Sequence, residues 1–210
     1  NYIFSVVTRN HDLGDEALDD LDGRWSEVLE QLGEANFTEF VRYHHNIQAS
    51  LTTKRNLFKA IRQTLDSPQK AHGYLDSLTR YAAIYGALLS PYDEFWHQQG
   101  FVGESLKELQ HYLEGFQLFG IRQPFGILMV AYTKMSAEEF LKLMRYIFVL
   151  SVRYNVVGKG SPSVQEHANN KIAVRIYNAE YTRASHVKNS PEFQRLYPRD
   201  ESFESEFGYL

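Results

Sequence analysis

A stripe of apolar and aromatic residues at helical spacing, over residues 68–89, is the feature that most constrains how this chain folds. Its members recur at intervals of three and four residues: Ala71, Tyr74, Leu75, Leu78, Tyr81, Ala82, Tyr85, Leu88 and Leu89. That spacing places them on one face of an α-helix. Ser67 is a suitable N-cap, Pro68 fits the first helical position, and Ser90-Pro91 predicts the end of the helix.

The same periodicity recurs along almost the whole chain. Capping boxes, in which a polar N-cap is followed three residues later by Glu, predict further helix starts. They occur at Asn36/Glu39, Ser136/Glu139 and Ser163/Glu166, and glycines 33 and 120 follow apolar stripes as helix ends. Because no run of alternating β-branched residues predicts a strand, we expect an all-α array of eight or nine helices. The looser stretch 93–105 predicts a boundary between two packed sub-bundles near Gly100.

The segment "FLKLMRYIFVLSVRYNVV", residues 140–157, is apolar nearly all round, which predicts a central helix. It is followed by "GKGS" at 158–161, which raises the question of a phosphate-binding loop. Such a loop needs G-x-x-x-x-G-K-[ST] after a strand, whereas here Arg153 occupies the first glycine position and Lys159 precedes Gly160. We therefore interpret Gly158 as a left-handed helix end.

Composition narrows the class of protein. The chain has 210 residues, of which 43 % are hydrophobic and 23 % charged, so we expect a packed globular core. It contains no cysteine, which excludes disulfides and thiolate zinc sites. The longest apolar stretch is too short for a membrane span and carries Lys142 and Arg145. These features predict a cytoplasmic location and no membrane partner.

No motif predicts chemistry on the chain itself. His44 and His45 are adjacent, so on a helix their side chains diverge by about 100° and do not form a metal-binding i, i+4 pair. Neither H-E-x-x-H nor a nucleophile elbow G-x-S-x-G is present. We therefore predict no catalytic residue, no metal site and no cofactor bound by this segment.

The net charge of −4 conceals a strong segregation of charge. Residues 12–39 contain ten acids and one base, residues 40–65 contain five bases and no acid, and residues 140–188 contain eight bases and two acids. Such runs are typical of solvated helix faces. The basic runs also fit a surface that binds a polyanion, because clustered Lys and Arg bind phosphates. On the second interpretation, nucleic acid is contacted by Arg153, Lys159, Lys171 and Arg175.

Several segments, in order, resemble the helical middle region of type IV (modification-dependent) restriction endonucleases of the GmrSD kind. The matching segments are "FTEFVRYHHNIQAS" (37–50), "KRNLFKAIRQTL" (54–65), "LDSLTRYAAIYGALLSP" (75–91), "FGIRQPFGILMVAY" (119–132) and "LMRYIFVLSVRYNVVGKGSPSVQEHANNKIA" (143–173). "NYIFS" at 1–5 is similar to the segment leaving the preceding domain, and "LYPRDESFESEF" at 196–207 is similar to the start of the following one.

The resemblance implies that catalysis belongs to the domains on either side of this helical region. In that family a ParB/sulfiredoxin-like nucleotidase domain precedes the helical region and an HNH-type nuclease domain follows it. Nucleoside triphosphate and divalent metal are bound by those flanking domains, whose D-G-x-Q-R and His-Asn-His motifs are not found in this sequence. The implied organisation is a helical connector over residues 1–199, with 200–210 as the start of the nuclease-like domain or a tail.

Two main hypotheses follow. In the first, the chain is a non-catalytic connector that positions the flanking domains of the same polypeptide and contacts DNA through its basic segment. In the second, it is a protein-interaction or homo-oligomerisation module without nucleic-acid binding, in which the acidic N-terminal helix faces the basic region of a neighbouring subunit or domain. A further alternative is that the chain is itself an enzyme, which would need a pocket of converging His and carboxylate side chains that sequence spacing does not reveal.

Overall fold

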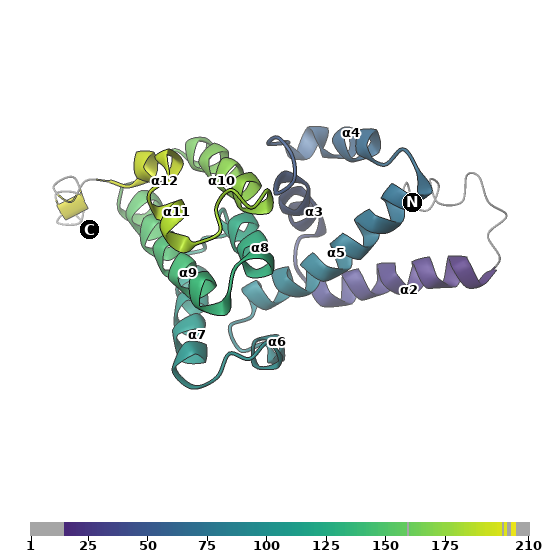
Figure 1. Ribbon diagram of the computed structural model, residues 1–210, viewed down its shortest axis with the longest axis horizontal. Helices are drawn as coiled ribbons and strands as arrows, with labels where there is room; N and C mark the ends of the chain where they lie inside the picture. Colours follow the sequence, from purple (N-terminus) through teal and green to yellow (C-terminus); the bar gives the residue numbers. More distant parts are fainter. Residues whose placement is uncertain (1–14, 159, 199, 201–202, 205–210) are drawn as a thin grey trace. The chain divides into compact units, whose positions relative to one another are not determined.

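The computed structural model describes residues 15–158, 160–198, 200 and 203–204. This part of the chain is all-α, with eleven α-helices, a π-helical segment and no strand (Figure 1). The prediction of an all-α fold is confirmed. The α-helices are α2 (Asp15–Leu32), α3 (Phe37–Asn46), α4 (Lys54–Thr64), α5 (Pro68–Leu89), α6 (Glu94–Gln98), α7 (Gly103–Leu118), α8 (Phe125–Lys134), α9 (Ala137–Ser151), α10 (Pro162–Tyr177), α11 (Ala184–Lys188) and α12 (Pro191–Leu196). The π-helical segment η1 (Val152–Val157) continues directly from α9.

The chain divides into two compact units. Unit 1 comprises residues 1–45 and 52–86, and unit 2 comprises residues 46–51 and 87–210. The division falls between Gly86 and Ala87, within α5, and Gly100 lies inside unit 2. Of the two segments that resemble flanking regions, 1–5 lies outside the described residues, and so do residues 199, 201–202 and 205–207 of the segment 196–207.

In unit 1, α2 and α3 both pack against α5. Arg24 of α2 forms an ion pair with Asp76 of α5 at 2.5 Å, and the rings of Phe40 in α3 and Tyr85 in α5 lie 5.5 Å apart. Both of these rings are fully buried. All residues of the predicted α5 stripe except Tyr74 and Leu89 are buried, as their spacing indicated.

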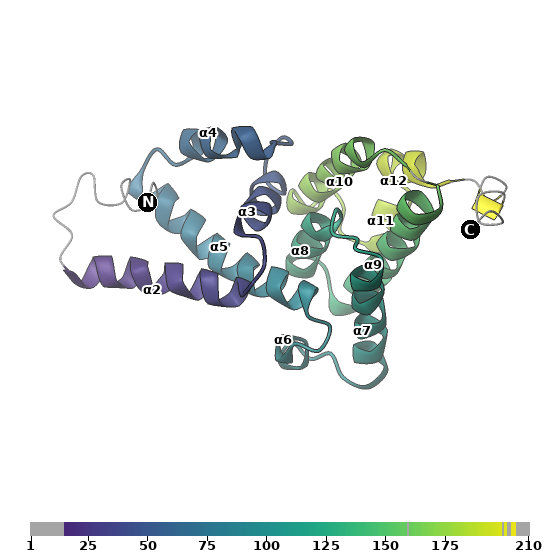
Figure 2. The same ribbon diagram turned by 180° about the vertical axis from the view of Figure 1, so that it is seen from behind.

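Unit 2 is built around α8 and α9. All residues of α8 from Phe125 to Ala131 are buried, and the helix packs against α9 and α10 (Figures 1 and 2). Helix α9 also contacts α7 and α11, so the helix predicted to be central is central within this unit. Helix α12 packs against α10 and α11. Among the described residues, no helix is both long enough and apolar enough to span a membrane.

Most predicted helix boundaries are confirmed by the hydrogen bonds at the helix ends. The Asn36 side chain accepts from the Glu39 amide at 2.9 Å, and the Ser136 and Ser67 hydroxyls accept from amides three residues later. Gly33 and Gly120 follow α2 and α7 with φ of +53° and +62°, the left-handed conformation that glycine adopts without strain.

Two local predictions are wrong. Gly158 has φ of −78°, not a left-handed value, because the helix ends in a π-helical turn in which the Gly158 amide donates to the Arg153 carbonyl at 2.9 Å. The capping box at Ser163 is not formed either. Helix α10 begins two residues earlier, with Ser161 as N-cap and Pro162 in its first turn, so Ser163 is already helical.

Candidate functional site

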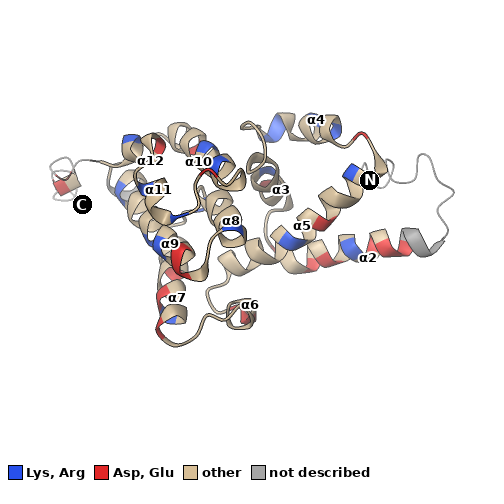
Figure 3. Ribbon diagram, in the orientation of Figure 1, with Lys and Arg blue, Asp and Glu red and all other residues tan. Residues whose placement is uncertain are grey.

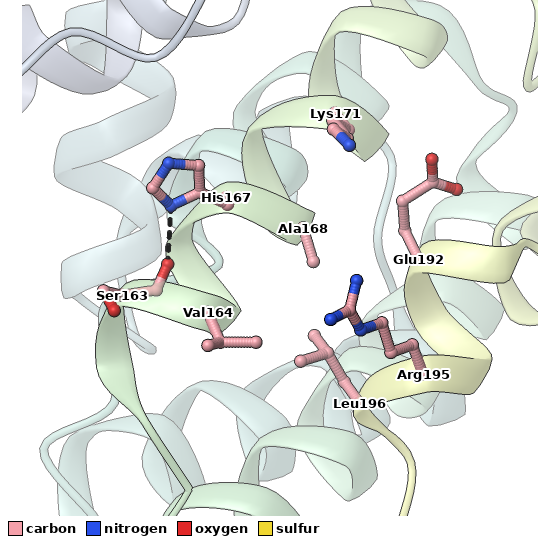
Figure 4. A pocket seen from close by; sticks show the side chains of 8 residues that line it. All are labelled: Ser163, Val164, His167, Ala168, Lys171, Glu192, Arg195 and Leu196. Carbon is pink, nitrogen blue, oxygen red and sulfur yellow. Dashed lines mark hydrogen bonds between the residues drawn. The ribbon is translucent and has the colours of Figure 1, made fainter.

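A pocket of about 400 Å³ lies between α10 and α12, and we call it the Lys171 pocket (Figure 4). Five of its lining residues come from α10, where the helical repeat brings them onto one face. Three come from α12, on the facing side. The lining residues are Ser163, Val164, His167, Ala168, Lys171, Glu192, Arg195 and Leu196.

The helix geometry fixes the orientation of His167 in this pocket. Its Nδ1 lies 2.8 Å from the Ser163 carbonyl oxygen, one turn earlier on α10 (Figure 4). A carbonyl oxygen can only accept, so Nδ1 donates this hydrogen bond and carries the proton. In the neutral ring Nε2 is then an acceptor, and on protonation it becomes a second donor. His167 thus adds a polar, exposed group to the rim.

The acid that lines the pocket, Glu192, has a basic partner. The Arg175 guanidinium lies 3.4 Å from its carboxylate, and the Tyr181 hydroxyl donates to it at 3.4 Å. Arg175 is held in turn, because its guanidinium donates to the Tyr181 hydroxyl at 2.5 Å. This hydrogen bond and the charge of Glu192 raise the pKa of Arg175. The Glu192 side chain is only 11 % exposed, and its charge is compensated by the Arg175 guanidinium.

The remaining two charges of the pocket are positive and uncompensated. Lys171 and Arg195 are exposed, and neither forms an ion pair with another described residue. Figure 3 shows basic residues on both α10 and α12. Two uncompensated cations at one concave surface, with a compensated acid between them, favour an anionic ligand. Arg presents a planar fork of donors to a phosphate, and Lys adds a point charge.

The residues predicted to contact nucleic acid have different environments. Lys171 lines the pocket, and Arg175, one turn later, holds Glu192 beside it. Lys159 lies outside the described residues. Arg153 lies in η1, with its side chain 15 % exposed. The structure thus brings Lys171 and Arg175 to one site.

Arg153 forms an internal clamp on the C-terminal segment. Its guanidinium lies 4.6 Å from the ring centre of Tyr197 and 4.2 Å from that of Phe203. It donates to the Tyr197 hydroxyl at 2.8 Å and pairs with Asp200. In this arrangement the Arg153 guanidinium binds side chains of the same chain, and not an external phosphate.

Sequence reasoning missed Arg195 as a site residue. Arg195 lies in α12, whose N-cap Ser190 accepts a hydrogen bond through its hydroxyl from the Phe193 amide at 3.2 Å. An α-helical wheel over α12 places Glu192 and Arg195 three residues apart on one face. The sequence does not indicate that this face of α12 packs against α10.

A second group of exposed bases lies on α4 in unit 1. Lys54, Arg55 and Lys59 are exposed and form no ion pair with any described residue, and Phe58 on the same helix is 62 % exposed (Figure 3). This helix accounts for most of the basic run predicted over residues 40–65. Its bases lie along one helix, whereas those of the Lys171 pocket converge from two.

The histidines do not form a metal centre within the part of the chain that the structure describes. No group of three or more His, Asp or Glu residues there is arranged to hold a metal ion. His44 is fully buried in α3, with its Nε2 2.7 Å from the Ser77 hydroxyl and its ring packed edge-on against Tyr74 and Tyr81. Its burial and the neighbouring His45 lower its pKa to about 3.

Comparison of the chain with protein-family models, with curated proteins and with solved structures gave no match. The resemblance to type IV restriction endonucleases therefore depends on the order of the sequence motifs alone.

Proposed function

We propose that this chain is a non-catalytic helical connector of a prokaryotic restriction-type nuclease and that its Lys171 pocket contacts the phosphates of DNA. The observation that carries the DNA contact is the convergence of Lys171 and Arg195 from two helices, while Arg175 compensates the neighbouring Glu192. The order of the resembling motifs supports the connector role. It also supports a cytoplasmic location and a part in phage defence.

The chemistry of the pocket fits a backbone contact more closely than a sequence-reading contact. Charged donors at an open pocket bind phosphate oxygens whatever the base, and they make binding depend on salt. The Ser163 hydroxyl and the His167 imidazole are further polar groups of the pocket that can donate hydrogen bonds to phosphate oxygens. We therefore expect affinity for DNA with little sequence preference.

Fluorescence anisotropy with a labelled DNA duplex, over a series of salt concentrations, tests the proposal. Lys171→Gln and Arg195→Gln should each weaken binding at low salt. Each should also flatten the plot of log affinity against log salt concentration by about 0.9, the value for one lost phosphate contact. Lys107→Gln is the matched control, because it removes the same charge from α7, where Lys107 pairs with Glu104 at 2.8 Å.

The proposal is wrong if the chain does not bind DNA at low salt. It is also wrong if Lys107→Gln weakens binding as much as the two pocket variants, because binding would then reflect net charge alone. Circular dichroism at 222 nm confirms for each variant that the helices are retained.

A second candidate function, self-association, is favoured by the charges of unit 1. On α2 the exposed acids Asp19, Asp22, Glu27 and Glu30 form no ion pair with any described residue, and α4 carries the exposed bases described above (Figure 3). Complementary faces on one unit permit two copies to pair reciprocally. Light scattering that shows a dimer at low salt and a monomer at high salt, without DNA binding, would favour this alternative.

A further inference from the structure

A second pocket, of about 260 Å³, lies on the other side of α12, and we call it the Tyr146 pocket. It is lined by Arg145, Tyr146, Val149, Lys188, Phe193, Gln194 and Tyr197. We propose that this pocket receives an unstacked nucleobase, so that the nucleic acid bound is single-stranded at this point. The inference depends on the proposed function, because the Lys171 pocket supplies the neighbouring phosphate contact.

The walls of the Tyr146 pocket are aromatic. The rings of Phe193 and Tyr197 are stacked, with centres 5.9 Å apart and planes 20° apart. The Lys188 ammonium lies 4.9 Å from the centre of the Tyr146 ring, and the Lys188 side chain is exposed. A planar base that stacks on Tyr146 displaces this ammonium, which is then free to pair with a phosphate.

The charges of the pocket are both positive. Arg145 and Lys188 are exposed, neither forms an ion pair with another described residue, and no carboxylate lines the pocket. Aromatic walls beside two cations suit a ligand that is planar and apolar at one end and anionic at the other. A nucleotide has this combination. The volume is below the roughly 300 Å³ at which pockets for drug-sized ligands begin, so a single base suits it better than a larger group.

The Tyr197 ring, which forms one wall of the pocket, is fixed by Arg153. Arg153 lies over the Tyr197 ring at 4.6 Å and donates to its hydroxyl at 2.8 Å. On this proposal Arg153 acts as a positioning residue for the aromatic wall. The role differs from the direct phosphate contact that the sequence suggested for it.

The two pockets share α12. Glu192, Arg195 and Leu196 line the Lys171 pocket, whereas Phe193 and Gln194 line the Tyr146 pocket. These residues lie on opposite faces of α12, and an α-helix with its side chains is about 10–12 Å across, so a strand has to span only this width to reach from one pocket to the other. One strand that crosses α12 can thus place a phosphate at Lys171 and a base at Tyr146.

The test compares three oligonucleotides of one length by anisotropy at low salt: a duplex, a single strand and a single strand with abasic positions. We expect the single strand to bind more tightly than the duplex and the abasic strand to lose about five- to tenfold in affinity. Tyr146→Leu should lose the same factor on the intact single strand and nothing on the duplex. A 2-aminopurine in the single strand should be quenched by the wild type and not by Tyr146→Leu.

Tyr177→Leu is the matched control. Tyr177 on α10 also carries a lysine over its ring, Lys134 at 5.2 Å, but it lines neither pocket. It should bind all three oligonucleotides as the wild type does. The abasic comparison uses the unaltered chain, so it decides the question even if Tyr146→Leu fails to fold.

Two results would overturn the inference. If duplex, single and abasic strands bind equally while Lys171→Gln weakens all of them, the Tyr146 pocket takes no base, and the proposed function stands. If a free mononucleotide binds in a manner sensitive to Tyr146→Leu, while the single strand is insensitive to it, the occupant is a free nucleotide. Absence of binding to any nucleic acid would instead reject the proposed function.

Discussion

The Arg175 guanidinium lies 3.4 Å from the Glu192 carboxylate, so a base on α10 compensates the acid that α12 contributes to the Lys171 pocket. Arg175 itself does not line that pocket. Its effect on an anionic ligand is therefore indirect: it cancels a repulsive charge. If Arg175 contacted phosphate directly, its effect on DNA affinity would not depend on Glu192. The two roles can therefore be distinguished by removing Arg175 with and without Glu192.

We predict that Arg175→Gln weakens DNA binding about two- to fivefold, or roughly 0.4–1 kcal/mol, as for other partly exposed charges. The reason is that the Glu192 charge is then uncompensated beside Lys171. Glu192→Gln should strengthen binding by a similar factor, and the double variant should bind nearly as the wild type does. Anisotropy titrations of the four proteins form a double-mutant cycle.

Glu180→Gln is the control for this cycle. Glu180 also lies near Arg175, at 3.9 Å, but does not line the pocket, so its loss should change DNA affinity little. If the double variant binds as weakly as Arg175→Gln alone, Arg175 acts as a direct ligand.

The buried His44 predicts a loss of stability in mild acid. Burial lowers its pKa from 6.5 to about 3 in the folded chain. Between these values the unfolded chain binds a proton that the folded chain does not bind, so stability falls as the pH drops below 6.5. The slope is about 1.4 kcal/mol per pH unit, which gives a loss of about 2 kcal/mol at pH 5. Urea unfolding at a series of pH values measures this slope.

The variant His44→Gln should flatten the dependence, because glutamine keeps a polar group near the Ser77 hydroxyl without titrating. Part of the slope should remain, since burial also lowers the pKa of His45. An unaltered slope in His44→Gln would mean that His44 is not held neutral in the folded chain.

Glu139 links the first turn of α9 to the start of α11. Its carboxylate accepts from the Ala184 amide at 2.7 Å, and this hydrogen bond is the main cause of its lowered pKa. We predict that Glu139→Gln costs about 1.5–3 kcal/mol near neutral pH, as for other hydrogen bonds to a charged group. A lowered pKa stabilises the fold above 4.5, and this contribution is lost as the pH falls through the folded-state value.

Glu138→Gln is the matched control for this prediction. Glu138 is 77 % exposed and pairs only with Lys142 among the described residues, so its loss should cost less than about 0.5 kcal/mol. Thermal unfolding at neutral and acid pH compares the two variants. Equal costs, or a Glu139→Gln effect that persists at low pH, would show that the Ala184 hydrogen bond does not carry the difference.

Long elements of the fold could be predicted from the sequence, because periodicity needs several turns to be recognised. Helix α5 has 22 residues and an unbroken stripe, and its N-cap Ser67 was identified correctly. Helices α6 and α11 have five residues each and were missed, since so short a segment does not complete two turns. The π-helical turn before Gly158 was missed as well, because it interrupts a sequence that reads as a continuous helix.

The candidate site was predictable only in part, for a different reason. Lys171 and Arg175 lie one turn apart on α10, and this relationship is visible in the sequence. The pairing of Arg175 with Glu192 and the position of Arg195 opposite Lys171 depend on how α12 packs against α10. Sequence spacing contains no information on that packing. The clamp of Arg153 on Tyr197, 44 residues away, was unpredictable for the same reason.

The close approach of α2 to α5 gives the last prediction, on Gly86. A Cβ atom added to this glycine would lie 2.3 Å from the backbone carbonyl oxygen of Gln31, so alanine here requires a backbone shift. We expect Gly86→Ala to cost about 1–3 kcal/mol, as for other overpacked contacts. On the same helix, a Cβ atom at Gly73 would meet nothing within 4 Å. Gly73→Ala should therefore stabilise the chain by about 0.5–1 kcal/mol through the higher helix propensity of alanine.

The opposite signs of the two variants make the comparison decisive, since the chemical change is identical and only the surroundings differ. Urea unfolding followed by circular dichroism at 222 nm gives both free energies. If Gly86→Ala and Gly73→Ala change the free energy of unfolding equally, α2 does not approach α5 closely at Gly86. A destabilised Gly86→Ala together with a stabilised Gly73→Ala would show that this glycine is required for the close packing of α2 against α5, which an effect on helix propensity alone would not explain.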